Sequence, residues 1–308
     1  MRISLLIPTY KRSKDLARCL QSIEHQTKSP NEVVVVCRDE DWDTRTFLEG
    51  ITDLRLPLRI ILVDVPGQVA ALNAGLAQVS SDIVAITDDD AAPWPDWLSR
   101  IETHFSENPR LGGVGGRDHV IGYGPYREHK TVGILQWFGR RIGNHHCGKG
   151  EARRVDFLKG ANMSYRMAAL GPLRFDQRLR GSGAQVHNDF AFSLEVRARG
   201  WQIIYDPAVA VDHYPAQRFG NDERFGDDVR SRSATNASAY NETLAVLEYF
   251  PRYRHVFFWF WAIVAGTDEL PGLLRCIVSP TARMRRRLLS ALGGRFEALA
   301  IARKRRSR

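Results

Sequence analysis

The chain has 308 residues, of which 44% are hydrophobic and 26% charged, and its formal net charge is +9. These proportions are ordinary for a globular protein and exclude a collagen-like chain, a disulfide-rich miniprotein and extended disorder. The charge is uneven: residues 275–308 hold eleven basic residues and one acid, Glu297, so the rest of the chain is close to neutral. A basic nucleic-acid-binding core is therefore not expected, and no nucleic-acid partner is predicted.

Cysteine usage and the absence of long apolar runs indicate the compartment. The four cysteines stand far apart, with no CxxC pair and no metal-ligand spacing; they are Cys19, Cys37, Cys147 and Cys276. This usage favours a reducing compartment. No cationic leader with a cleavage site opens the chain, and no apolar run reaches the ~18–20 residues that span a bilayer. The sequence predicts a cytoplasmic protein.

The first part of the chain alternates short β-branched runs with helical patterns. Strands are predicted at residues 3–7, 33–36, 59–63 and 83–86, and helices at 15–25 and 68–77. Such alternation is typical of an α/β fold with a mainly parallel sheet. The strands are continuous apolar runs, as expected where helices cover both faces of the sheet.

The later part of the chain is less regular. Residues 111–150 are rich in Gly, Arg and His with weak periodicity and are expected to be irregular. A helix is predicted over 187–200, followed by strand patterns at 202–205 and 209–211. We expect a catalytic domain over 1–240 and a helical C-terminal extension over 241–308.

Three consecutive aspartates, Asp88, Asp89 and Asp90, follow the fourth predicted strand. Carboxylates crowded at the end of a buried strand repel one another, and a divalent cation bridged to phosphate oxygens relieves that repulsion. Taken alone, the triplet is equally compatible with an aspartate-rich turn that caps the next helix.

Six short motifs follow one another over residues 1–215. They are LIPTYKR at 6–12, NAG at 73–75, DDD at 88–90, GANMS at 160–164, ND at 188–189 and His213. In this order and spacing they resemble the motifs of family 2 glycosyltransferases. The resemblance implies the glycosyltransferase A type of fold, a Rossmann-like, mixed but mainly parallel sheet flanked by helices that binds a nucleotide-diphosphate sugar.

The resemblance also implies a metal and donor site. Asp88 and Asp90 match the Asp-x-Asp motif that holds Mn²⁺ or Mg²⁺ against the diphosphate. His213 matches a histidine that completes the metal site or contacts the diphosphate, and it is expected here as a metal ligand. The middle residue, Asp89, matches a position that faces the sugar. The other expected donor contacts follow the first two strands or precede the fourth; they are Pro8, Thr9, Tyr10, Arg12, Asp39 and Asn73.

Asp189 is the expected catalytic base, because the resemblance places the family's base at the amino end of a helix across the cleft. An aspartate at a helix start is also explained by capping alone. Asn188 stands where the family usually has glutamate. The acceptor side is expected to include Gly160, Ala161, Asn162 and Asn188.

The end of the second strand departs from the family pattern. Many relatives have an acidic residue there that reads uracil, whereas this chain has Cys37 and Arg38, and Asp39 aligns only after a shift of one residue. A uridine donor therefore does not follow, and thymidine or guanosine donors stay open.

Residues 256–265 form an aromatic-rich apolar run ahead of the basic C-terminal segment. This pattern is typical of a peripheral protein that contacts an anionic membrane through 256–308, although a buried core helix, a dimer contact or a solvated tail explains it equally well.

The sequence thus predicts an inverting glycosyltransferase that uses a nucleotide-diphosphate sugar and a glycan or lipid-linked acceptor. A sugar-nucleotide nucleotidyltransferase is the first alternative, but residues 8–12 lack the glycine-rich loop expected for it. The second alternative is a non-enzymatic protein that binds nucleic acid or membrane through its basic segment.

Overall fold

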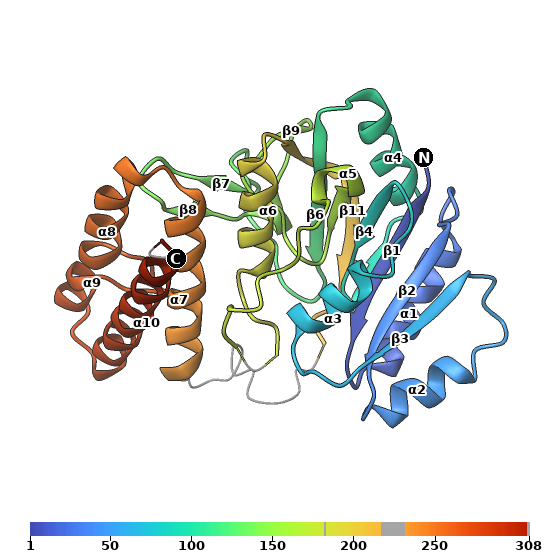
Figure 1. The fold of residues 1–308 in the computed structure, drawn as a ribbon, viewed down its shortest axis with the longest axis horizontal. Helices are drawn as coiled ribbons and strands as arrows, with labels where there is room; N and C mark the ends of the chain where they lie inside the picture. The colour runs from blue at the N-terminus through green and yellow to red at the C-terminus, as the bar shows by residue number, and fades with distance from the viewer. Residues whose placement is uncertain (182, 217–231, 307–308) are drawn as a thin grey trace.

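The computed structural model describes residues 1–181, 183–216 and 232–306. Within these residues a nine-stranded sheet has the strand order β3-β2-β1-β4-β10-β6-β11-β5, with β9 paired to β11 (Figure 1). Its strands are β1 (Ile3–Thr9), β2 (Glu32–Arg38), β3 (Leu58–Val63), β4 (Ile83–Ile86), β5 (Ala91–Pro93), β6 (Leu111–Val120), β9 (Arg153–Arg154), β10 (Met163–Arg166) and β11 (Gln202–His213). The strands β1 to β4 are parallel, β6 is parallel to β11, and β10 is antiparallel to both of its neighbours. The predicted mainly parallel α/β sheet is confirmed.

Helices cover both faces of the sheet because successive side chains of a strand point to opposite sides. Leu5 and Ile7 of β1 pack into the core formed with α1 (Ser13–Glu24), α2 (Trp42–Glu49) and α4 (Trp97–Glu107). Leu6 packs into the opposite core, formed with α3 (Gln68–Leu76), α5 (Met167–Leu170) and α6 (Asn188–Ala198). Burial on both faces explains why β1, β2 and β4 are continuous apolar runs, whereas the edge strand β3 is half-buried to exposed.

The register of the parallel strands brings the aspartate triplet to the end of β1. Leu6 pairs with Ile86 of β4, and the Thr87 N–H donates to the Leu6 carbonyl at 3.2 Å. The chain therefore leaves β4 beside Thr9. At the far end of β11, His213 pairs with Ala91, the residue that follows the triplet. Three segments far apart in the sequence thus meet at one edge of the sheet.

The expectation that residues 111–150 are irregular is wrong for their first ten residues, which form β6 between β10 and β11. The glycines of β6 permit close packing: a Cβ on Gly112 would lie 2.6 Å from Cβ of Trp201, and one on Gly116 would lie 1.6 Å from the Val209 carbonyl oxygen. These glycines make a buried strand look like a loop in the sequence. Farther along lies a two-stranded hairpin of β7 (Ile134–Leu135) and β8 (Arg141–Ile142).

The C-terminal part is helical, as predicted. It consists of α7 (Arg232–Tyr249), α8 (His255–Val264), α9 (Leu273–Val278) and α10 (Ala282–Arg306), gathered at one end of the molecule (Figure 1). The predicted boundary at residue 240 falls inside α7, and Phe190 of α6 shares a core with Leu244 of α7 and Phe258 of α8. The division of the chain at residue 240 stays a prediction. No described helix is both long and apolar enough to cross a bilayer.

Candidate active site

A cavity of about 1060 Å³ opens along the carboxyl ends of β1, β2 and β4. One end is lined by residues that follow β1 and β2, among them Tyr10 and Arg38. The other end is lined by residues of the segments 141–146 and 183–189. The aspartate triplet lies on the cavity wall between these two ends. Ligands of open α/β sheets bind at this edge of the strands.

Asp88 and Asp89 have different surroundings. Asp88 is half-buried and accepts a hydrogen bond from Nε2 of Gln68 at 3.3 Å. Asp89 is 2% exposed and accepts from Oγ1 of Thr9 at 2.8 Å and from Nη1 of Arg12 at 2.9 Å. Burial raises the pKa of Asp89 to about 7, although Arg12 and Thr9 both favour its charged form. Asp89 therefore ties the turn after β4 to the segment after β1.

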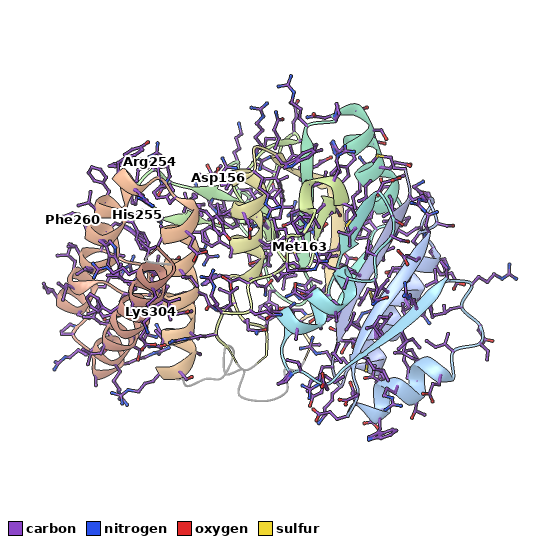
Figure 2. All side chains as sticks on the ribbon, in the orientation of Figure 1. Asp156, Met163, Arg254, His255, Phe260 and Lys304 are labelled. Atoms are coloured by element: carbon purple, nitrogen blue, oxygen red, sulfur yellow. The ribbon has the colours of Figure 1, made fainter. Side chains whose placement is uncertain are left out.

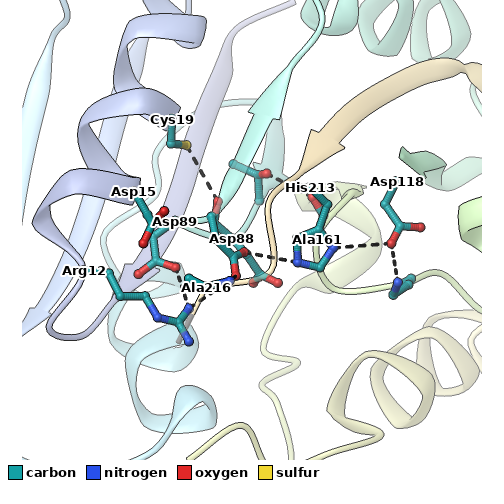
Figure 3. A network of polar contacts seen from close by, with 12 residues as sticks. Arg12, Asp15, Cys19, Asp88, Asp89, Asp118, Ala161, His213 and Ala216 are labelled. Carbon is teal, nitrogen blue, oxygen red and sulfur yellow. Dashed lines mark hydrogen bonds and ion pairs between the residues drawn. The ribbon is translucent and has the colours of Figure 1, made fainter. Parts of the chain in front are cut away.

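Asp90 begins a chain of buried charges that runs through His213 (Figure 3). Nε2 of His213 lies 3.4 Å from Oδ1 of Asp90, and Nδ1 lies 3.6 Å from Oδ2 of Asp118. Asp118, at 1% exposed, is also paired with Lys159. Burial would lower the pKa of His213, but the neighbouring carboxylates of Asp118 and Asp90 raise it to about 9. Burial alone would raise the Asp118 pKa, yet Lys159 and His213 hold it well below its usual range.

The donor atoms at this edge fit a divalent cation that shares its ligands with a diphosphate. Oδ1 of Asp90 is buried and accepts no hydrogen bond, and Asp88 and His213 line the same cavity. Over the described ranges, no three acids, histidines or cysteines are close enough to form a protein-only ligand set. Mg²⁺ is commonly held by one or two carboxylates plus substrate phosphates, so a partial set of this kind suits it.

Asp189 lies in the first turn of α6, on the cavity wall. Its Oδ2 accepts from the Gly160 N–H at 3.0 Å and its Oδ1 accepts from the Phe190 N–H at 2.7 Å. One hydrogen bond to each oxygen fixes the carboxylate and leaves a lone pair on each oxygen for a further proton. Asn188 donates to Oε1 of Gln68 at 3.2 Å, which connects the start of α6 to the residue bonded to Asp88.

The structure brings most of the predicted site residues to one cavity. They are Pro8, Thr9, Tyr10, Arg12, Asp88, Asp89, Asp90, Gly160, Ala161, Asn188, Asp189 and His213.

Three predicted residues lie outside the cavity lining of the described chain, for reasons visible in their contacts. Asn73 exchanges two hydrogen bonds with the backbone of Phe175, at 2.9 and 2.8 Å. Asn162, at 1% exposed, accepts from Nε1 of Trp97 at 2.9 Å and donates to backbone carbonyls. Asp39 is exposed, and its backbone carbonyl accepts from Arg45. Both buried amides therefore hold backbone segments together at the back of the site.

Several cavity residues were not predicted. Glu40 lines the cavity near the end of β2, whereas Asp39 does not. It accepts from the Tyr10 hydroxyl at 3.2 Å and pairs with Arg38 at 3.0 Å. Lys159 lies between the two halves of the site: burial lowers its pKa, but the charges of Asp118, Asp189 and Asp88 raise it. No local sequence signal marks Lys159 or Asp118, because they meet only through the sheet.

Two solved structures share this fold over most of the chain. Staphylococcus aureus TarS 1–349 in complex with UDP-GlcNAc matches with a TM-score of 0.65 at 17% identity, over 97% of this chain and 81% of that one. GalNAc-T7 with UDP, GalNAc and Mn²⁺ matches with a TM-score of 0.63 at 15% identity, over 85% of this chain and 50% of that one. The fold is therefore of the glycosyltransferase A type.

Residues 4–171, more than half of the chain, match the family model described as Glycosyl transferase family 2. The chain belongs to this family, as the motifs predicted.

Curated relatives match mainly in part. Glycosyltransferase AglE of Haloferax volcanii is 33% identical over 101 residues, which are 32% of this chain and 33% of that protein. The succinoglycan biosynthesis protein ExoM of Rhizobium meliloti is 26% identical over 224 residues, 70% of this chain and 67% of that protein. Across AglE and the uncharacterized glycosyltransferases alr2836 and YwdF, the chain spans 33% to 38% of the relative's length.

Proposed function

We propose that this protein transfers a sugar from a nucleoside-diphosphate-sugar donor to a hydroxyl group of a glycan or lipid-linked acceptor, with inversion at the anomeric carbon. The observation that carries the proposal is one cavity with Asp88 and Asp90 at the end of β4 and Asp189 at the start of α6. A solved structure of similar fold contains UDP-GlcNAc, and a relative is named for succinoglycan biosynthesis, which supports this donor and acceptor class.

The donor would lie with its nucleoside beside Tyr10, Arg38 and Glu40 and its diphosphate beside the aspartates. A Mn²⁺ or Mg²⁺ ion held by Asp88, Asp90 and the diphosphate would offset the negative charge that develops on the leaving group. His213 would join as a ligand only in its neutral form, so the ion would have to displace its proton. Arg12 is held at this end by Asp89 at 2.9 Å and Asp90 at 3.5 Å, which keeps a cation at the mouth of the donor site.

Asp189 would act as the general base. Its carboxylate accepts the proton of the acceptor hydroxyl while that oxygen forms a bond to the anomeric carbon. The bond from the anomeric carbon to the diphosphate oxygen breaks, and its electron pair leaves with the diphosphate. Attack from the face opposite the leaving group inverts the configuration. The Gly160 N–H keeps Oδ2 in place before and during the transfer.

The cysteines support the expected compartment. All four are free, and Cys19, Cys37 and Cys147 are buried. A protein without disulfides fits a reducing environment, so we keep a cytoplasmic location as part of the proposal.

The function is tested by incubating the full chain and Mn²⁺ with UDP-, dTDP-, GDP- and CDP-sugars. We expect one nucleotide class to release its nucleoside diphosphate, with the first sugar product in the inverted anomeric form by NMR. A glycan fraction that contains the acceptor should accelerate release. A parallel sample receives added pyrophosphate. Formation there of a nucleoside triphosphate and a sugar 1-phosphate, with no nucleoside diphosphate, would indicate a nucleotidyltransferase, and no turnover of any donor would refute the proposal.

A further inference from the structure

The helices α8 and α9 expose apolar side chains to solvent. Four apolar residues of α8 and of the short 3-10 turn before it are 45% to 68% exposed: Tyr253, Val256, Phe257 and Phe260. Their spacing places them on one face of a helix. Figure 2 shows Phe260 pointing outward at the end of the molecule. The buried side of α8 is provided by other residues, chiefly Phe258 and Ala262. The exposed apolar side chains are therefore not the ones that pack α8 against the rest of the protein.

The same surface continues on α9 and α10. Ile277 is 73% exposed and Val278 is 85% exposed, and none of the residues of α9 is buried. Phe296 of α10 stacks on Trp259 of α8 with ring centroids 5.8 Å apart, so α10 borders α8. We define the C-terminal apolar face by its exposed members, which are Tyr253, Val256, Phe257, Phe260, Leu273, Leu274, Ile277, Val278, Leu289 and Phe296.

Positive charge surrounds this face. From Arg252 to Lys304 there are ten basic residues and three acids. The exposed basic residues are Arg252, Arg283, Arg285, Arg286, Arg303 and Lys304. Arg295 is an exception, because it is fully buried against Glu242 and Thr243. Arg305, Arg306 and Arg308 lie outside the side chains that the structure describes. Exposed apolar side chains and exposed basic residues on the same group of helices are the composition of an anionic-lipid contact.

The face is also connected to the acceptor end of the cavity. Trp137, in the turn of the β7–β8 hairpin, packs edge-on against Phe257 with ring centroids 4.9 Å apart. Arg141, at the other end of that turn, lines the cavity, and so does Glu269 between α8 and α9. Arg141 lies over the ring of Phe190, the residue after Asp189, with 5.7 Å from its guanidinium carbon to the ring centroid. An acceptor at this end of the cavity would thus lie beside the apolar face.

We infer that the C-terminal apolar face docks on a bilayer rich in anionic phospholipid and presents the acceptor end of the cavity to a lipid-linked acceptor. The first half of the inference stands on the exposed residues and their charge, whereas the second half rests on the proposed function. A second copy of this chain would carry the same excess of positive charge and would be repelled, which favours the lipid surface as the occupant.

Flotation of the full chain with vesicles tests the docking. Wild-type protein is expected to float with vesicles that contain about 30% phosphatidylglycerol. The bound fraction should be about tenfold lower with pure phosphatidylcholine vesicles, or with the same anionic vesicles at high salt. The double variant Phe260→Glu and Ile277→Glu should lose about tenfold of its binding, because it places two charges on the apolar face. The matched control is Trp42→Glu, since Trp42 is 66% exposed on α2 at the other end of the molecule.

Three outcomes would overturn the inference. Wild-type protein could fail to float with the anionic vesicles, or the double variant could float as well as Trp42→Glu. Light scattering could also show that the wild type is a dimer and that the double variant is a monomer. Titration with UDP, dTDP, GDP and CDP in the presence of Mn²⁺ is run on the same samples. Retained nucleotide binding with no flotation would refute only the docking. Flotation with no nucleotide binding would refute the transferase proposal and the presentation of an acceptor that rests on it, but not the docking.

Discussion

Asp189→Asn is expected to reduce sugar transfer by about 10²- to 10⁴-fold, the usual contribution of a general base. Asparagine keeps the shape of the side chain and one carbonyl oxygen, so the hydrogen bond from Gly160 is retained, but the amide does not accept the acceptor's proton at neutral pH. The measurement is acceptor-dependent release of nucleoside diphosphate under saturating donor. The affinity for the nucleotide should change by less than about threefold, because the proposed mechanism has Asp189 contact the acceptor and not the nucleotide.

The matched control is Asp15→Asn. Asp15 is also an aspartate in the first turn of a helix, α1, where it pairs with Arg18 at 2.6 Å. A carboxylate at such a position stabilises the helix end by only ~0.3–1 kcal/mol. If Asp189 were merely a helix-end carboxylate, both variants would keep transfer near the wild-type rate, and that result would contradict its role as base.

Asp118→Asn is expected to lower the free energy of unfolding by about 2–3 kcal/mol, which is typical when a buried polar group loses a charged partner. The loss is below that of a fully buried ion pair because the Lys159 side chain is 37% exposed. The substitution leaves Lys159 and His213 without their shared carboxylate, and Asp118 is 1% exposed, so water does not replace it. Urea denaturation at neutral pH measures the effect. Donor turnover should also fall, because His213 and Lys159 would no longer be held at the cavity.

Glu128→Gln is the control for Asp118→Asn. Glu128 pairs with Arg117 and Lys149 but its side chain is 44% exposed, so the loss should be at most ~1 kcal/mol. The pH dependence gives a second check. Because the pKa of Asp118 is held below the unfolded value of ~3.9, its stabilisation is complete above that pH and declines as the pH falls below it. The difference between wild type and Asp118→Asn should narrow on acidification. Equal loss in both variants at neutral pH would contradict the account.

The strands β1, β2 and β4 could be predicted from sequence because each is a continuous apolar run that is buried on both faces. The edge strand β3 could also be predicted from its apolar run, although its side chains are half-buried or exposed. The strand β6 could not. Its glycines are required by Trp201 and Val209, residues of distant segments that press on the strand. Hydrophobic periodicity reflects only residues close in the sequence. A strand that needs glycines because of distant packing partners is therefore predicted as a loop.

The candidate site shows the same limit. Asp88, Asp90, Asp189 and His213 were expected from the resemblance to the family motifs, and the structure places all four on the wall of one cavity. Their roles stay proposals. Asn73 and Asn162 belong to the same motifs, yet their amides bond to backbone rather than lining the cavity. Motif membership does not distinguish the two roles, since both need a polar side chain near the strand ends.

Residues whose partners are distant could not be found at all. Asp118 follows the glycines of β6, and its partners Lys159 and His213 lie on other segments. Arg295 belongs to the basic C-terminal segment, which the composition predicts to be a surface contact. In the structure it is fully buried and pairs with Glu242 of α7. Charge alone therefore does not tell a lipid-facing arginine from a buried one.

Metal-dependent nucleotide binding is the most direct test of the central claim that this cavity is a donor site. Calorimetric titration of UDP, dTDP, GDP and CDP, with Mn²⁺ and with chelator, should show one nucleotide binding only in the presence of the metal. Asp90→Ala should abolish that binding, while Asp39→Ala, outside the cavity lining, should leave it unchanged. Binding of no nucleotide, or equal binding by wild type and Asp90→Ala, would contradict the account.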